Sequence, residues 1–200
     1  MVVLAFAVAA LTSAALASAA GAAPAWKFNG TELSGKETIV GAATSSSLKI
    51  PTAATVECEH FLYSMKISNT AGKGTGEVTE VPLYECKVIP STCTVAAITA
   101  EKLPWPDHLV TVGTTDYLYI EKVYVSITYG GEECALEGTT VVVNGSAGGK
   151  IENSAQQATF NKASFEATGA VLKVGSSAVE WNGVFPTEAF EEHREQALEG

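Results

Sequence analysis

The stretch Val123-Tyr124-Val125-Ser126-Ile127-Thr128-Tyr129 decides the fold class of this chain. Its odd-numbered side chains are large and apolar, whereas the side chains between them include Ser and Thr. Such an alternation places the two sets on opposite faces of an extended backbone and predicts a β-strand with one buried face. Upstream, Leu118 and Ile120 follow the opposite phase, so we expect a β-bulge or a turn near Glu121-Lys122.

Short strand-like runs occupy most of the chain. They cover residues 37–50 (two strands around 43–45), 55–68, 76–89, 93–99, 139–143, 157–160, 170–174 and 178–181. Asn-Gly pairs at Asn29, Asn144 and Asn182 favour type I′ hairpin turns between such runs. The polar, Gly-rich residues 145–158 have no clear period and predict a surface loop or a seam between groups of strands. The pattern indicates an all-β fold, an antiparallel β-sandwich or barrel.

Four cysteines, Cys58, Cys86, Cys93 and Cys134, are available for cross-links. An even number in an exported chain favours two disulfides, and zinc is disfavoured because no Cys-x₂-Cys pair is present. Each cysteine lies in a strand-like run, and consecutive strands are usually neighbours, so we prefer the pairing Cys58–Cys86 with Cys93–Cys134. A hairpin bridge Cys86–Cys93 across Pro90 remains open.

The N-terminal residues indicate export. Residues 1–25 carry no charged side chain, and residues 2–16 form an apolar run too short for a bilayer, which needs roughly 20 residues. Small residues follow, with cleavage sites after Ala19 or Ala22. We expect a signal peptide at 1–22, a single secreted β-domain at 23–186 and an acidic tail at 187–200 that forms at most a short helix. An uncleaved N-terminal anchor helix is the alternative.

The net charge of −10 restricts the partners of the chain. Nucleic acid and anionic lipid both attract positive surfaces, so binding to either is not expected. No second long apolar run follows the first, which predicts no membrane span in the mature chain. We expect an extracellular protein, either free or associated with the cell envelope.

The segment Leu103-Pro104-Trp105-Pro106-Asp107-His108-Leu109 holds the candidate binding residues. Its two prolines favour an extended backbone. In one interpretation Trp105 stacks on a sugar ring or a proline, and Asp107 and His108 supply polar contacts. In the interpretation that we favour, Trp105 tucks under the sheet and the prolines turn a corner between strands.

The sequence shows no catalytic pattern. Its histidines, His60, His108 and His193, are scattered, and no Gly-x-Ser-x-Gly motif is present. Two glutamates could still meet in space as an acid–base pair, which makes a secreted carbohydrate-active hydrolase one alternative function. An interaction protein that uses its acidic tail is another. No cofactor and no metal site are predicted, since the calcium-loop pattern is also absent.

The order of several features resembles that of a known family. An opening at 26–30 is followed by the first three cysteines, by Leu103-Pro104-Trp105 with Leu109, and then by Cys134 with Leu136 and Gly138. Over residues 26–145 this order is similar to a large set of uncharacterised secreted proteins found in many copies in soil actinobacteria. The resemblance implies an extracellular or cell-surface β-domain and supplies no catalytic residues to carry over. We therefore expect a secreted, non-enzymatic binding or structural module, whose partner is a cell-wall polysaccharide or another surface protein.

Overall fold

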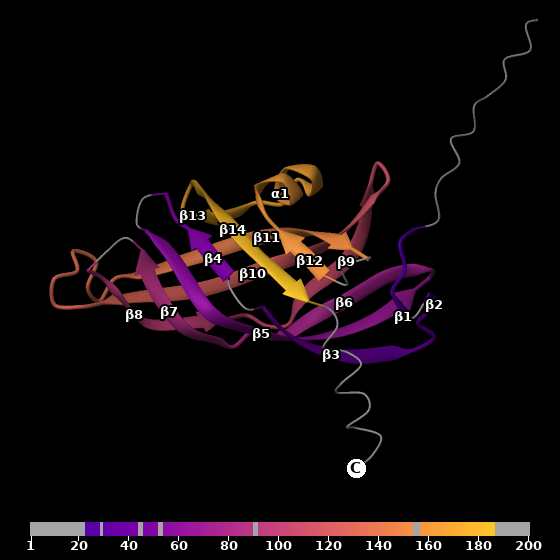
Figure 1. Ribbon diagram of the computed structural model, residues 1–200, viewed down its shortest axis with the longest axis horizontal. Helices are drawn as coiled ribbons and strands as arrows, with labels where there is room; N and C mark the ends of the chain where they lie inside the picture. Colours follow the sequence, from indigo (N-terminus) through magenta and orange to yellow (C-terminus); the bar gives the residue numbers. More distant parts are fainter. Residues whose placement is uncertain are drawn as a thin grey trace, which may run out of the picture.

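The computed structural model describes residues 23–28, 30–43, 46–51, 54–89, 92–153 and 157–186. The expected signal peptide, the tail and its candidate helix lie outside these residues. Strands dominate the described chain, and helix α1 (Lys162–Thr168) lies on the outside of the sheet (Figure 1). The strands are β1 (Lys27–Phe28), β2 (Thr31–Glu32), β3 (Lys36–Ala43), β4 (Ser46–Lys49), β5 (Thr55–Thr70), β6 (Lys73–Glu80), β7 (Leu83–Ile89), β8 (Thr94–Ala100), β9 (Trp105–Val112), β10 (Thr115–Gly130), β11 (Thr140–Glu152), β12 (Gln157–Phe160), β13 (Leu172–Val174) and β14 (Ser177–Pro186).

The strands pair into a sheet that closes on itself. Antiparallel pairings lead from β4 through β5, β6, β9, β10, β11, β12 and β14 back to β4. In such a ring every second side chain of a strand faces the interior. The antiparallel all-β fold predicted from the sequence is confirmed.

The ring has two ends, which are completed by different strands. At one end β6 and β9 connect β5 to β10, and β12 connects β11 to β14. At the other end β7 and β8 connect β5 to β10, and β13 connects β11 to β14. We call the first the cavity end, because it encloses the cavity described below, and the second the disulfide end. The 16-residue strands β5 and β10 run through both ends.

Both disulfide bonds lie at the disulfide end. Cys58 of β5 is bonded to Cys86, its direct cross-strand partner on β7. Cys93, immediately before β8, is bonded to Cys134 in the connection between β10 and β11. The preferred pairing is confirmed, and the alternative bridge Cys86–Cys93 is not formed.

The phase slip predicted near residues 121–122 is a β-bulge inside one continuous strand. The register of β10 against β11 shifts between Ile120 and Val123, and Lys122 has a positive φ of 56°. The bulge restores the inward direction for both halves of β10, since Ile120 and Val123 are both buried despite their opposite parity. Ile127 and Tyr129, farther along, are completely buried, as their alternation predicts.

The run at 76–89 forms two strands rather than one. β6 ends at Glu80 and β7 begins at Leu83, with Pro82 between them. Proline has no N–H to offer to a sheet, so a break is favoured there. The Pro82 carbonyl accepts a hydrogen bond from the Leu62 N–H at 3.0 Å, which holds the break against β5. The break lets β6 pair with β9 while β7 pairs with β8.

The interpretation of residues 145–152 as a surface loop is wrong, and so is the hairpin turn at Asn144-Gly145; β11 instead joins β10 on one side to β12 and β13 on the other, as the alternative interpretation as a seam expected. β11 continues to Glu152, and both residues lie within it. Gly145 has a φ of 137°, and a Cβ there would collide with the Val171 carbonyl oxygen. The glycine therefore allows a neighbouring backbone to pass close to β11. In the sequence, a glycine needed for such close packing inside a strand cannot be told from a glycine that forms a turn.

The other two Asn-Gly pairs behave differently from each other. Gly30 has a φ of 79° in the connection between β1 and β2, which agrees with the predicted turn. The turn predicted at Asn182-Gly183 is wrong, because both residues lie inside β14. Gly183 is followed by the buried Phe185, whose ring lies 2.9 Å from the position a Cβ of Gly183 would occupy. This glycine makes room for an aromatic ring in the interior.

The sequence reasoning missed helix α1. Its N-cap Asn161 accepts a hydrogen bond from the Ser164 N–H at 2.9 Å, and the Ser164 hydroxyl accepts one from the Asn161 N–H at 3.0 Å. Gly169 ends the helix in the left-handed conformation, with φ of 69°. The Ser164 hydroxyl also donates to the Gly148 carbonyl at 2.6 Å, which fixes α1 against β11.

Candidate functional site

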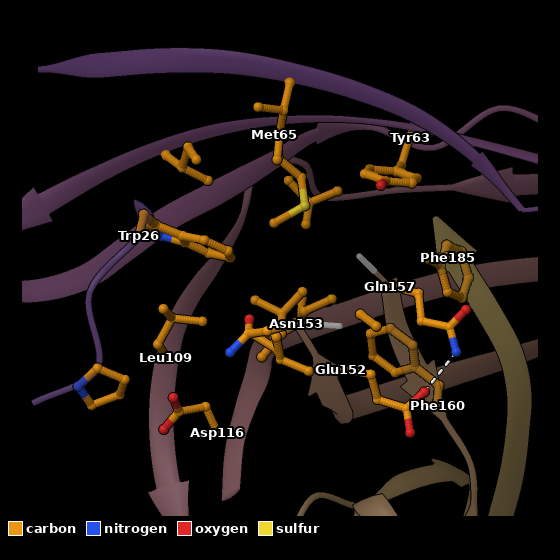
Figure 2. Close-up of a pocket in the computed structure, with 18 of the residues that line it drawn as sticks. Trp26, Tyr63, Met65, Leu109, Asp116, Glu152, Asn153, Gln157, Phe160 and Phe185 are labelled. Atoms are coloured by element: carbon orange, nitrogen blue, oxygen red, sulfur yellow. Dashed lines mark hydrogen bonds between the residues drawn. The ribbon is translucent and has the colours of Figure 1, made fainter. Parts of the chain in front are cut away.

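The interior of the cavity end is hollow. It encloses a cavity of about 740 Å³, lined mainly by apolar side chains from β3, β5, β6, β9, β10, β12 and β14. Figure 2 shows Trp26 and Leu109 on one side of this space and Tyr63, Phe160 and Phe185 on the other. Small-molecule sites in proteins commonly have volumes of roughly 300–1,000 Å³ and an apolar lining. The cavity therefore has the size and surface of a ligand site.

Aromatic rings form the floor of the cavity toward the disulfide end. Phe160 stacks on Trp181 with ring centroids 4.6 Å apart, and Phe185 meets Phe61 edge to face at 4.9 Å. The indole N–H groups are satisfied without using the cavity, since Trp181 donates to the Ser46 hydroxyl at 2.7 Å and Trp105 donates to the Glu101 carbonyl at 2.8 Å. The floor is thus held in place and presents carbon surface to the cavity.

Glycines in the wall make space for large side chains from other strands. A Cβ on Gly149 would lie 2.6 Å from the Phe160 ring, and one on Gly74 would lie 2.6 Å from the side chain of Leu109. The same is true of Gly41 and the ring of Tyr63. In each pair, a large side chain occupies the space left by a glycine on a neighbouring strand. A larger residue in place of any of these glycines would therefore displace that side chain and change the shape of the cavity.

The N-terminal residues of the described chain lie across the cavity end. The Trp26 N–H donates to Asn69 Oδ1 at 2.8 Å, and Asn69 Nδ2 donates back to the Trp26 carbonyl at 2.9 Å. The Trp26 indole donates to the Thr75 carbonyl at 3.2 Å, and the Gly74 N–H donates to the Pro24 carbonyl at 2.8 Å. We call residues 23–28 the strap. Its residues 23–27 line the cavity, so the strap forms part of its wall near the mouth.

The mouth is polar and acidic. Asp116 accepts a hydrogen bond from the Thr111 hydroxyl at 2.6 Å. Glu152 accepts hydrogen bonds from Gln157 at 2.6 Å, Lys150 at 3.1 Å and Thr159 at 3.2 Å. These bonds lower the pKa of the Glu152 carboxyl, and the bond from Gln157 has the largest effect. Figure 2 shows Asp116, Asn153 and Glu152 along one edge of the cavity. These carboxylates are already partnered by the protein.

The three binding candidates from the sequence do not share one surface. Trp105 and Asp107 face the interior and are 2% and 3% exposed, whereas His108, between them and Leu109, faces outward. His108 Nδ1 lies 3.5 Å from Glu121 Oε1, and its ring centroid lies 5.3 Å from that of Tyr119. Trp105 lines the cavity instead of forming an exposed aromatic platform. The interpretation in which Trp105 tucks under the sheet describes its position.

Asp107 is an unusual buried acid. Neither of its carboxyl oxygens has a hydrogen-bond partner in the described part of the chain. Burial, with a further contribution from the negative charge of Glu77, raises the pKa of Asp107 from 3.8 to about 8. Desolvation disfavours the charged form of a carboxyl, so Asp107 is largely protonated at neutral pH. It is a polar group inside a mostly apolar interior.

Within the described residues, no group of three or more His, Cys, Asp or Glu side chains is arranged to hold a metal ion. No helix of that part of the chain has both the length and the apolar character needed to cross a membrane. Glu152 at the mouth accepts hydrogen bonds from protein donors, as described above. The prominent feature of the interior is therefore a space rather than a cluster of reactive groups.

Sequence reasoning missed most of the residues that form the cavity. Phe61, Phe160 and Phe185 lie on three different strands, and each reads locally as an ordinary core residue. Only Trp105 was singled out, because of its flanking prolines. Comparison of the chain with protein-family models, with curated proteins and with solved structures found no match.

Proposed function

We propose that this chain is an exported, non-enzymatic β-domain that binds a small, largely apolar molecule inside its ring of strands. The cavity of about 740 Å³ carries the proposal. Protein interiors are normally close-packed, with few voids larger than a water molecule. A hollow of this size with an aromatic floor is a feature of proteins that enclose a ligand in a closed antiparallel sheet.

The position of Trp105 supports an enclosed ligand over a polymer bound at the surface. A platform for a polysaccharide needs an aromatic face open to solvent, and Trp105 is 2% exposed. The same indole lines the cavity, where it can contact a molecule small enough to enter. Binding inside the ring also fits a chain whose sequence shows no catalytic pattern, since a carrier needs shape and apolar surface rather than reactive groups.

The test is to fill the cavity from one of its own lining residues. Ala158 of β12 lines the cavity and is buried, so its replacement by Phe would occupy part of the space. Ala97 of β8 is exposed at the disulfide end, and Ala97→Phe adds the same side chain away from the cavity. Binding is followed by the fluorescence of N-phenyl-1-naphthylamine, which increases in apolar surroundings.

We expect saturable binding of this probe at one site by the unmodified protein. Ala158→Phe is expected to weaken binding at least tenfold, and Ala97→Phe to leave it unchanged. Equal binding by all three proteins, or no binding by the unmodified one, would contradict the proposal. Circular dichroism of both variants establishes that the sheet is formed. The same samples also test whether the protein acts as an enzyme. If it does not, the probe extracted after long incubation should have an unchanged mass.

A further inference from the structure

Asp116 is an acid on the inward face of the ring, at the mouth of the cavity. On β10 it comes two and four residues before Leu118 and Ile120, which are buried and line the cavity. Side chains two residues apart on a strand point to the same face, and β10 pairs with β9 without a register shift over these residues. Asp116 lines the cavity as well, and Figure 2 shows its carboxyl at the edge of the space.

The Asp116 carboxylate is oriented by the protein and remains accessible. Its cross-strand partner on β9 is Thr111, whose hydroxyl donates to Asp116 Oδ1 at 2.6 Å. A hydroxyl is neutral, so this bond fixes the direction of the carboxylate without removing its charge. A carboxylate has about four acceptor positions, and most of them are left for another donor. Because Asp116 is only half-buried, a molecule in the cavity can reach it.

The other charged residues that line the cavity have partners of opposite charge. Lys27 and Glu32 are cross-strand partners on β1 and β2. Glu152 forms an ion pair with Lys150, with a distance of 3.1 Å between Nζ and Oε1. Within the described residues, no ion pair includes Asp116. The charge of Asp116 is therefore available to a ligand.

Apolar and aromatic surface adjoins this carboxylate. Leu109 of β9 is the cross-strand partner of Leu118, and both side chains line the cavity. Trp26 of the strap lies beside Leu109, since a Cβ on Gly74 would be 2.6 Å from the Leu109 side chain and 3.1 Å from the indole. Figure 2 shows Trp26, Leu109 and Asp116 along one side of the cavity. Aromatic surface attracts cations, as a carboxylate does.

The charge of the whole chain favours the same sign of ligand. The net charge of −10 attracts cations and repels anions before they reach the mouth. A long-chain carboxylate would then meet the like charge of Asp116, whereas an ammonium group would form an ion pair there. A neutral amphipathic molecule would gain the apolar contacts of the cavity without this electrostatic contribution.

We infer that the ligand is an amphipathic amine, whose ammonium group pairs with the Asp116 carboxylate at the mouth while its hydrocarbon part extends into the cavity. The inference rests on the proposed function. From Asp116 the inward face of β10 continues through Leu118 to Ile120, which lies about 14 Å away along the strand. This apolar surface binds the hydrocarbon part, and the carboxylate selects the polar group.

The experiment measures how well decylamine, decanol and decanoic acid displace N-phenyl-1-naphthylamine from the unmodified protein at neutral pH. The three competitors have hydrocarbon chains of similar length and differ in the charge of the polar group. We expect the amine to bind about three to ten times more tightly than the alcohol, because a charge-assisted hydrogen bond at a half-buried site is stronger than a neutral one. The acid should bind most weakly. In about 0.5 M salt the differences should shrink, since charges at the mouth are screened.

Three variants assign the preference to one carboxylate. Asp116→Asn removes the charge but keeps an oxygen that can accept the Thr111 hydrogen bond, so the advantage of the amine should disappear while the affinity for the alcohol is retained. The matched control Glu121→Gln removes an equal charge from β10 at the outer surface, where Glu121 lies 3.5 Å from His108, and should keep the preference. Ala158→Phe fills part of the cavity and should weaken the amine and the alcohol to the same extent.

The outcomes separate this inference from the proposed function. Equal affinity for amine and alcohol, tightest binding of the acid, or no displacement of a bound probe by any of the three would overturn the inference and leave a cavity for apolar molecules. A preference that persists in Asp116→Asn, or that is lost equally in Glu121→Gln, would refute the role of Asp116. Failure of the probe itself to bind would overturn both proposals.

Discussion

Replacement of Asp107 by Asn should stabilise the empty protein increasingly as pH rises. In the unfolded chain this acid has an ordinary pKa of 3.8, and in the folded protein burial raises it to about 8. The folded state therefore binds the proton more tightly than the unfolded state between these values. Stability falls as pH rises through this window and becomes constant above pH 8. Asparagine does not titrate, so the variant lacks this loss.

The size of the effect follows from the same two pKa values. Between pH 5 and pH 8 the folded state holds a proton that the unfolded state has already lost, and each pH unit corresponds to about 1.4 kcal/mol. The difference in unfolding free energy between Asp107→Asn and the unmodified protein should therefore grow by about 4 kcal/mol between pH 5 and pH 9. The cost of burying the amide is the same at both pH values and cancels from this difference.

Urea denaturation at pH 5, 7 and 9 measures this quantity directly. Other titrating groups are common to both proteins, so their contributions cancel in the comparison. Asp116→Asn serves as the control, because Asp116 lies at the mouth and already accepts a hydrogen bond from Thr111. Parallel stability curves for the unmodified protein and Asp107→Asn across this pH range would refute the assignment of Asp107 as a buried, protonated acid.

Three further perturbations test the fold and the cavity. Replacing Cys58 and Cys86 by Ala opens a loop with a sequence separation of 28 residues and should lower the unfolding free energy by about 3.5 kcal/mol in chemical denaturation; an unchanged value would show that this bond contributes nothing. Trp26→Ala removes the indole hydrogen bond of the strap and should increase both the association and dissociation rates of the naphthylamine probe in stopped-flow measurements, whereas unchanged rates would exclude the strap from ligand entry. Gly145→Ala should destabilise the protein by more than 2 kcal/mol, as expected for a positive φ combined with a backbone collision, while Gly138→Ala, where φ is 72° and nothing lies within 4 Å of the added Cβ, should cost about 1 kcal/mol; equal effects in thermal denaturation would contradict the collision.

The features that the sequence predicted correctly depend on local patterns. The buried face of 123–129 is visible in its period of two, and the phase slip before it marks the bulge at Lys122. The disulfide pairing was preferred because consecutive strand-like runs are usually neighbours, and the runs 55–68 and 76–89 do meet at the cross-strand pair Cys58–Cys86, although β6 separates β5 from β7 along the chain. Each of these features was predictable because it depends on the alternation within one strand or on the order of strands along the chain.

The features that it predicted wrongly depend on distant contacts. Asn144-Gly145 and Asn182-Gly183 have the composition of hairpin turns, yet each lies within a strand. What distinguishes them is tertiary: the Val171 backbone passes over Gly145, and the ring of Phe185 occupies the space beside Gly183. Helix α1 did have local signals in its caps, but seven residues are too few to show a helical period.

The cavity could not have been predicted from any local pattern. Its lining consists of residues such as Phe61 and Phe160, which have the same types and alternation as core residues elsewhere in the chain. Whether inward side chains meet or leave a space depends on the separation of strands that are far apart in sequence. Asp107 was visible as a candidate because of its neighbours, but its burial and its missing partners required the structure.

The two ends of the ring divide the tasks of stability and binding. At the disulfide end the interior is filled, with Ile127 and Tyr129 completely buried, and both cross-links constrain the unfolded chain there. At the cavity end, the side chains that line the cavity lack packing partners on one side, so they contribute less to the stability of the fold. Strands β5 and β10 run through both ends, so their register, set at the filled end, also determines the positions of the cavity walls. A site built in this way is formed before the ligand arrives, and binding does not have to order it.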